Sequence, residues 1–194
     1  MHYIVSDSKR KTILPRVVKA AVKLFVKYGI ENTSVRDVAA EAGVSVGALY
    51  RHFKSKDELA WNIFSTHLNQ FSLNLIARVS KSSSMKEKIK AYVSMCFEAF
   101  EENKDLFTYL IISEHQALKK FPASHIHPGH VANHIIENGQ KLGELKKTDS
   151  LVSSSILVGS IIRVCVVRMR RGIHQDLRLY IEPVSESLWN AVKK

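Results

Sequence analysis

The sequence predicts an all-α fold of about nine helices, because helical periodicity runs through most of the chain. Apolar residues recur at three- and four-residue intervals, and serines precede several of these stretches, where a helix needs a cap. Residues 161–167 have the β-branched composition of a strand, but the sequence offers no second strand to pair with them. We therefore expect helices throughout.

The first expected helix ends at Gly29. Its apolar positions follow an i, i+4, i+7, i+11 spacing, which predicts one buried face: Val17, Ala21, Leu24 and Tyr28. Glycine adopts the left-handed conformation that closes many helices at little cost, so the chain is expected to turn there.

Residues 34–53 predict two short helices joined by a tight turn at Gly43. Ser34 can accept a free amide hydrogen bond while Asp37 suits the positive end of the helix. Ser45 can cap the second helix in the same way, and Ser55 with Glu58 has the spacing of a capping box for the next. This is the pattern of a helix-turn-helix, whose second helix enters the major groove of DNA.

Residues 12–62 resemble the N-terminal domain of the TetR family of bacterial transcriptional regulators. The resemblance is carried by three segments: TSVRDVAAEAGVS from Thr33, GALYRHF from Gly47 and KSKDEL from Lys54. It implies a three-helix helix-turn-helix DNA-binding domain over residues 1–56. It also implies a larger helical domain for effector binding and dimerisation over residues 57–194, which matches the family only in length and helical rhythm.

The second helix of the motif supplies the expected DNA contacts. A recognition helix presents its first residues to base edges, here Ser45, Val46, Gly47, Ala48 and Arg51. Among these only arginine can bind a guanine through two hydrogen bonds. The resemblance places Tyr50, His52 and Lys56 at phosphates, and Ser34 and Lys54 are expected to add further phosphate contacts. The formal net charge of +11 suits a double-stranded DNA operator.

The C-terminal helices are expected to pair two copies of the chain. One recognition helix reads only about four or five base pairs, so such domains work as dimers on palindromic sites. Residues 151–171 are apolar nearly all round, which predicts burial on two sides. The expected homodimer interface comprises Ile156, Gly159, Ser160, Arg163, Val167, Leu188 and Trp189. Pro183 is expected either to kink the last helix or to restart it.

The middle of the chain is where the resemblance implies a cavity for a small-molecule effector. The residues expected to line it are Phe64, Leu68, Phe71, Tyr92, Cys96, Phe100, Phe107, Leu110, Ile111 and Glu114. A solid core is the alternative, since aromatic stripes at helical spacing usually pack in one. Glu114 lies within an apolar stripe, and a buried carboxylate needs a partner. The sequence leaves three options for Glu114: a pair with Arg163, a pair with a cation on a ligand, or an exposed position.

Cysteines and histidines suggest two sensors, each with a simpler explanation. Cys96 and Cys165 lie in apolar patterns, so core packing is expected and a thiol sensor is the alternative. Residues 125–134 contain four histidines, of which His130 and His134 have the spacing that can share a metal. Because residues 125–134 contain no Cys, Asp or Glu, we expect surface histidines, no metal and no cofactor, with a metal-responsive regulator as the alternative.

Several classes of protein are excluded by what the sequence lacks. It contains no glycine-rich phosphate loop, no nucleophile elbow and no paired carboxylates in a known motif, so no enzyme is expected. Residues 1–11 hold no signal-like apolar run, and the apolar run 156–167 is short and interrupted, so we expect a cytoplasmic protein with no membrane segment. The resemblance thus implies a ligand-responsive transcriptional repressor, released from its operator by the effector. A non-specific architectural DNA-binding protein remains the alternative.

Overall fold

The structure is a computed structural model that describes residues 7–117 and 127–194. Within these ranges the chain forms nine α-helices and one 3-10 helix, with an isolated bridge between Leu145 and Lys193, which confirms the all-α prediction. The helices are α1 (Asp7–Tyr28), α2 (Val35–Ala42), α3 (Val46–Tyr50), α4 (Lys56–Val79), α5 (Met85–Glu102), α6 (Lys104–Ala117), α7 (Pro128–Lys141), α8 (Ser150–Met169), η2 (Leu177–Tyr180) and α9 (Ile181–Val192).

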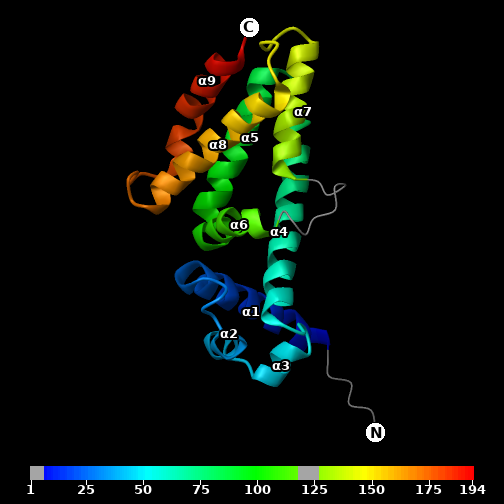
Figure 1. The fold of residues 1–194 in the computed structure, drawn as a ribbon, viewed down its shortest axis with the longest axis vertical. Helices are drawn as coiled ribbons and strands as arrows, with labels where there is room; N and C mark the ends of the chain where they lie inside the picture. Colours follow the sequence, from blue (N-terminus) through cyan, green and yellow to red (C-terminus); the bar gives the residue numbers. More distant parts are fainter. Residues whose placement is uncertain (1–6, 118–126) are drawn as a thin grey trace.

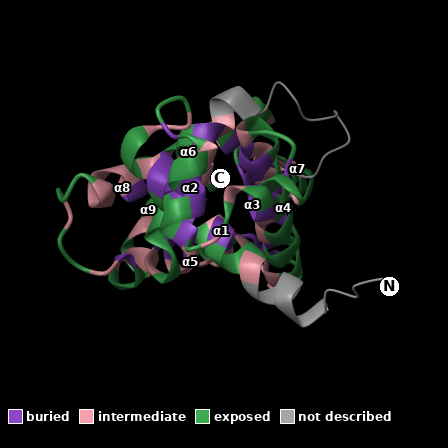
Figure 2. Ribbon diagram, turned by 90° about the horizontal axis from the view of Figure 1, so that it is seen from below, coloured by how far each residue is buried: buried purple, intermediate pink, exposed green. Residues whose placement is uncertain are grey.

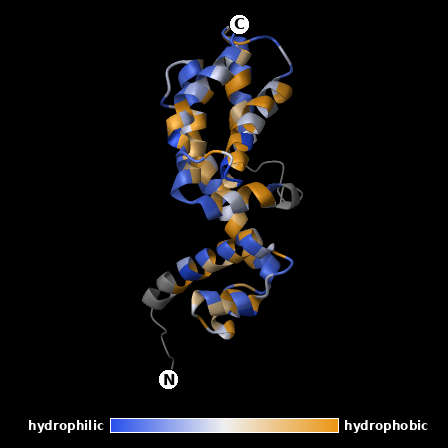
Figure 3. Cartoon of the chain, turned by 90° about the vertical axis from the view of Figure 1, so that its left-hand side faces the viewer, coloured by the Kyte–Doolittle hydropathy of each residue, from blue (hydrophilic) through white to orange (hydrophobic). Residues whose placement is uncertain are grey.

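The molecule has a small N-terminal head and a larger C-terminal body, joined by the long helix α4 (Figure 1). Two clusters of buried residues match these parts. The head core includes Phe25 and Leu49, and the body core includes Tyr92 and Ile161. Buried and exposed residues share the same helices in Figure 2, and hydrophobic and hydrophilic residues do so in Figure 3, as amphipathic helices require.

Helix α4 belongs to both cores. Its first half contributes Leu59 and Ile63 to the head, and its second half contributes Leu75 and Val79 to the body. A domain boundary at residues 56 and 57 therefore separates the start of α4 from the head core that it helps to form. That boundary stays a prediction.

Helix α6 is the main contact between the body and the rest of the head. It packs on α1, α4 and α5. The Tyr109 hydroxyl donates a 2.7 Å hydrogen bond to the carbonyl oxygen of Ala60, and its ring centroid lies 5.8 Å from that of Phe25. A displacement of α6 would therefore directly change the contacts of Tyr109 with Ala60 and Phe25.

Two expectations about single residues are settled by the helix ends. Gly29 ends α1 with a φ of +83°, as predicted, but Tyr28 is exposed because it follows the last buried turn of that helix. The helix that contains Pro183 starts anew just before it and is not kinked by it. Helix α9 begins at Ile181, so the proline lies in the first turn, where a helix needs no amide donor.

Helix α8 is long and apolar enough to cross a membrane by length and composition, and 22% of its apolar window is buried within the chain. The sequence-based expectation considered only the shorter run 156–167. The burial that exists is one-sided, through Leu157, Ile161 and Cys165, which face the body core. The opposite side of α8 carries exposed apolar residues.

Candidate DNA-binding surface and effector cavity

Two reciprocal hydrogen bonds fix the start of α2. The Ser34 hydroxyl oxygen accepts from the Asp37 amide at 3.1 Å, and the Ser34 amide donates to the Asp37 carboxylate at 2.9 Å. The Ser34 hydroxyl and amide hydrogen bonds hold the pKa of the Asp37 carboxyl below its ordinary value. The predicted cap at Ser34 is confirmed, with Asp37 as its partner.

The turn between α2 and α3 is set by Gly43, as expected. Its φ of +62° is left-handed, and the Arg16 guanidinium donates to its carbonyl oxygen at 3.0 Å. Ser45 then caps α3 by accepting from the Ala48 amide at 3.2 Å. Because Leu49 and Phe53 are buried in the head core, the opposite face of α3 is turned outward.

The residues expected at base edges are not all available to DNA. Ser45, Gly47 and Arg51 are exposed, and a side-chain carbon added at Gly47 would meet no atom within 4 Å. Val46 is half-buried. Ala48 is only 6% exposed. Little of its methyl group is therefore available for the expected contact with a thymine.

An open groove gathers most of the residues expected at phosphates. It runs between the start of α2 and the start of α4 and includes Ser34, Tyr50, Lys54 and Lys56. The Lys56 ammonium donates to the carbonyl oxygen of Glu31 at 3.0 Å, which holds this cation at the groove. The expected residue His52 lies outside the groove lining and is half-buried, with its ring beside that of Phe53.

The body contains a small cavity of about 60 Å³ between α4, α5, α6, α7 and α8. This volume is below the usual range for small-molecule sites, about 300–1,000 Å³, so a drug-sized ligand would have to widen it. Its lining comprises Leu68, Phe71, Tyr92, Cys96, Phe107, Leu110, Ile111, Glu114, His127, Pro128, Val158, Ile161 and Ile162. Of the alternatives for this region, the structure thus favours a cavity over a solid core.

All but two of the residues expected at the cavity line it. Phe64 belongs instead to the head core, about one turn before Leu68 on α4, and Phe100 is buried against Phe107 with its ring edge-on. The residues that sequence reasoning missed come from α7 and α8. The apolar face of α8 was visible in the sequence as a periodic stripe, but nothing there signalled His127.

Glu114 lies beside His127 and not beside Arg163. Its Oε1 atom is 3.0 Å from His127 Nε2, although Nε2 makes no aligned hydrogen bond, and the side chains are 37% and 17% exposed. His127 also caps α7, since its Nδ1 accepts from the Gly129 amide at 3.0 Å. An Nδ1 that accepts a hydrogen bond carries no proton, so the ring proton is on Nε2 and faces Glu114.

Residues 17–61 match the family described as bacterial regulatory proteins, tetR family, over the same α1–α4 region that forms the head.

The head of the chain is therefore similar to bacterial regulatory proteins of the tetR family.

Similar proteins cover different shares of this chain. It is 33% identical over 113 residues to the HTH-type transcriptional regulator YerO of Bacillus subtilis, a match that covers 55% of the chain and 39% of YerO. It is 24% identical over 151 residues to the fatty acid metabolism regulator protein of the same organism, covering 75% of the chain and 78% of that protein. The chain thus spans about two fifths of YerO.

A solved structure extends the likeness to the body. The transcriptional regulator FadR from Bacillus subtilis, in complex with stearoyl-CoA, superposes with a TM-score of 0.73 at 20% identity. The alignment covers 90% of this chain and 97% of FadR. At that identity the likeness shows that the two chains share a fold.

The outer side of α8 holds most of the residues expected at a dimer interface. Ile156 is 56% exposed, Gly159 and Arg163 are exposed, and Ser160 and Val167 are partly exposed. On α9, Trp189 is partly exposed. Leu188 is 6% exposed and packs in the core of its own chain, so its expected place at the interface is corrected.

The structure bears on both expected sensors, the cysteine thiols and the histidines of residues 125–134. Cys96 and Cys165 are buried, and burial raises the pKa of both thiols, that of Cys165 to about 12. Core packing therefore accounts for both cysteines, because a reactive thiol needs a low pKa. In the parts of the chain that the structure describes, no three His, Cys, Asp or Glu side chains gather as a metal site, and His125 lies outside those parts.

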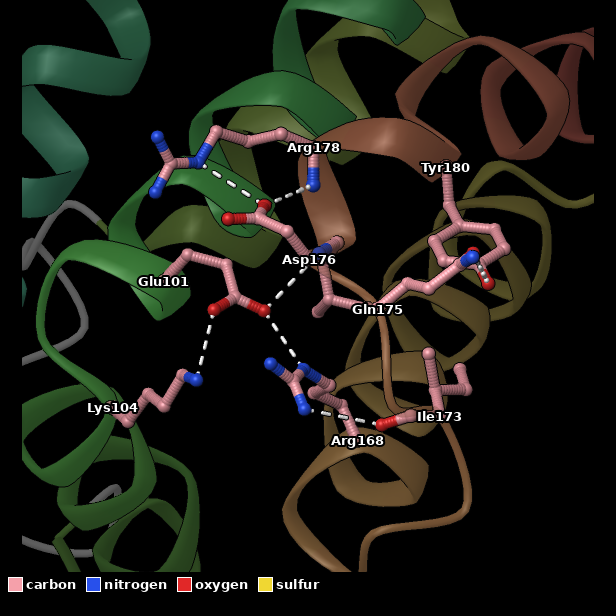
Figure 4. A network of polar contacts seen from close by, with 9 residues as sticks. Glu101, Lys104, Arg168, Ile173, Gln175, Asp176, Arg178 and Tyr180 are labelled. Atoms are coloured by element: carbon pink, nitrogen blue, oxygen red, sulfur yellow. Dashed lines mark hydrogen bonds and ion pairs between the residues drawn. The ribbon is translucent and has the colours of Figure 1, made fainter.

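A buried ion network went undetected in the sequence. Glu101, at the end of α5, accepts from Arg168 of α8 at 2.9 Å and from the Leu177 amide of η2 at 3.1 Å, and pairs with Lys104 at 3.0 Å (Figure 4). Burial alone would raise the pKa of this carboxyl, but the donors from Arg168, Lys104 and Leu177 outweigh it and lower the pKa to about 2. The network ties α5 and α6 to the end of α8.

Proposed function

We propose that this chain is a ligand-responsive transcriptional repressor that binds a palindromic operator as a homodimer. The observation that carries the proposal is the junction at α6. This helix lines the cavity through Phe107, Leu110 and Ile111, and it contacts the head through Tyr109. One helix thus contacts both the expected effector and the expected DNA-binding domain.

The proposed DNA contacts follow the outward face of the head. Arg51 reads a guanine, while Ser45, Val46 and Gly47 approach neighbouring bases. Tyr50, Lys54 and Lys56, with the amide end of α2 at Ser34, hold the phosphate backbone. The groove that gathers these four residues supports this division of roles. His52 contributes at its edge.

The proposed partner is a second copy of the chain, docked on the outer side of α8 and on Trp189 of α9. Exposed apolar residues on α8 support it: Leu151, Val152 and Ile156. A second copy also explains why so apolar a helix is so little buried within one chain. We place the protein in the cytoplasm with its DNA.

The proposed mechanism is a shift between two spacings of the recognition helices. Without effector, the two α3 helices match successive major grooves, about 34 Å apart. An effector that binds more tightly to a different position of α6 favours the other spacing and releases the DNA. A neighbour of the same fold was solved with stearoyl-CoA, which supports a small-molecule effector here. We assign the chain no enzymatic activity.

The test begins with selection of genomic fragments by the purified chain, followed by fluorescence anisotropy on the selected DNA and on random DNA. We expect an inverted repeat, bound at least about a thousandfold more tightly than random DNA, and a sedimenting dimer. Equal affinity for both DNAs would identify a non-specific architectural protein and reject the proposal. A monomer bound to a single half-site would reject the dimer.

A further inference from the structure

The effector cavity carries one unbalanced charge. The side chains of its described lining are apolar except at Tyr92, Cys96, Glu114 and His127. The Tyr92 hydroxyl is used, since it donates to the carbonyl oxygen of Pro128 at 3.1 Å, and the Cys96 thiol has its pKa raised by burial and stays protonated. The charge of this lining therefore depends on Glu114 and His127.

His127 does not neutralise Glu114. Its Nδ1 is occupied by the Gly129 amide, so a second proton there would break the cap of α7. The neutral ring has a single N–H, at Nε2, and that atom lies 3.0 Å from the carboxylate without hydrogen-bond alignment. A carboxylate accepts about four hydrogen bonds. Among the residues that the structure describes, most of the acceptor capacity of Glu114 is therefore left for a ligand.

We propose that the effector is a lipophilic amine, whose ammonium group pairs with Glu114 and whose hydrocarbon body enters and widens the small cavity between α4, α6 and α8. The inference rests on the proposed function, because it takes this cavity as the effector site. An amine donates charged hydrogen bonds to the free carboxylate oxygens, whereas an acid would place a second negative charge beside the first. Phe71, Phe107 and Ile162 supply the apolar walls for the remainder of the ligand.

Three probes with the same hydrocarbon chain and different head groups test this proposal: n-decylamine, 1-decanol and decanoate. Their binding to the full-length chain is measured by titration calorimetry. We expect decylamine to bind about tenfold or more tightly than decanol, and decanoate to bind most weakly, because only the amine forms a charged hydrogen bond. The ranking on the unsubstituted chain is itself a test.

The substitution Glu114→Gln keeps the shape of the side chain and removes its charge. We expect it to remove the preference for decylamine while decanol binding is retained, which also shows that the variant is folded. The matched control is Glu102→Gln, at an exposed glutamate of α5 outside the cavity, which should keep the preference. Tighter binding of decanoate or stearoyl-CoA than of decylamine, or an amine preference that survives Glu114→Gln, would overturn the proposal.

Operator binding is measured separately by anisotropy with and without decylamine. If the chain binds no specific DNA, the proposed function fails, whatever the head-group ranking. If it binds its operator but shows no amine preference, the inference on the ligand fails and the repressor function stands. Release of the operator by decylamine, and not by decanoate, supports both.

Discussion

At the scale of single residues, Glu101 shows how one buried carboxylate can hold helix ends together. Its side chain is 4% exposed and meets partners from α6, α8 and η2. Its folded pKa of about 2 lies below its ordinary value of 4.5, so the ionised form favours the folded state. The stabilisation is complete above the ordinary pKa and is lost as the pH falls through the folded pKa.

We expect Glu101→Gln to lower the free energy of unfolding at neutral pH by about 2 kcal/mol, because three donors lose a charged acceptor. The variant should also lose less stability than the parent between pH 4.5 and pH 2. Urea unfolding across this pH range measures both. Glu102→Gln, at the exposed neighbour, is the control, and equal effects of the two substitutions would contradict this role.

Arg51 and Lys56 are expected to differ in what they contribute to DNA binding. Arg51→Ala should cost roughly 1–3 kcal/mol at one operator position and relax base choice there, because two hydrogen bonds to a guanine are lost. Lys56→Ala should weaken all sequences about equally and reduce the salt slope by roughly one unit. Anisotropy on single-base operator variants at several salt concentrations separates the two, and identical behaviour would mean that the roles are wrongly assigned.

At the scale of elements, the two glycines of the helix-turn-helix have opposite requirements. Gly43 has a left-handed backbone, and a carbon added there would lie 2.6 Å from the Arg16 guanidinium. Gly47 lies inside α3 with open space around it. One glycine therefore shapes the turn, and the other leaves open space on the proposed DNA-binding surface.

We expect Gly43→Ala to lower the free energy of unfolding by about 1 kcal/mol or more, since alanine is strained at positive φ. Gly47→Ala should leave stability unchanged or raise it by up to about 1 kcal/mol, because alanine favours the helix. Thermal and urea unfolding compare them directly. Operator affinity should fall in Gly47→Ala despite its stability, and unchanged affinity would remove Gly47 from the DNA surface.

At the scale of the whole molecule, the outer side of α8 matters only when a second chain is present. The head carries α3 at the end away from the body (Figure 1). On the body, α8 carries exposed apolar residues at Leu151, Val152 and Ile156. Both features make sense if two copies join through α8 and α9, so that two α3 helices bind one palindrome.

We therefore expect Ile156→Glu to shift the protein from dimer to monomer and to abolish operator binding, because a charge is placed within the proposed interface. Leu73→Glu, at an exposed apolar residue of α4, is the matched control and should remain dimeric. Analytical ultracentrifugation with anisotropy measures both effects. A dimer that survives Ile156→Glu would place the interface elsewhere.

The sequence by itself determined the helix boundaries and the fold class. The caps at Ser34 and Ser45 and the turn at Gly43 depend on hydrogen bonds and backbone angles within a few residues, so local sequence suffices to predict them. Helical spacing also identified most of the cavity lining, for example Phe71, Tyr92 and Phe107, because the apolar face of each helix must turn inward.

Only the tertiary structure decided which of those faces meet. Glu101 and Arg168 are 67 positions apart, and Glu114 has His127 as its neighbour where the sequence also allowed Arg163. The burial of Leu188 and Ala48 depends likewise on the exact rotation of α9 and α3 about their axes. Periodicity shows which residues share the apolar face of a helix. The partner of a side chain on that face depends on how distant helices pack.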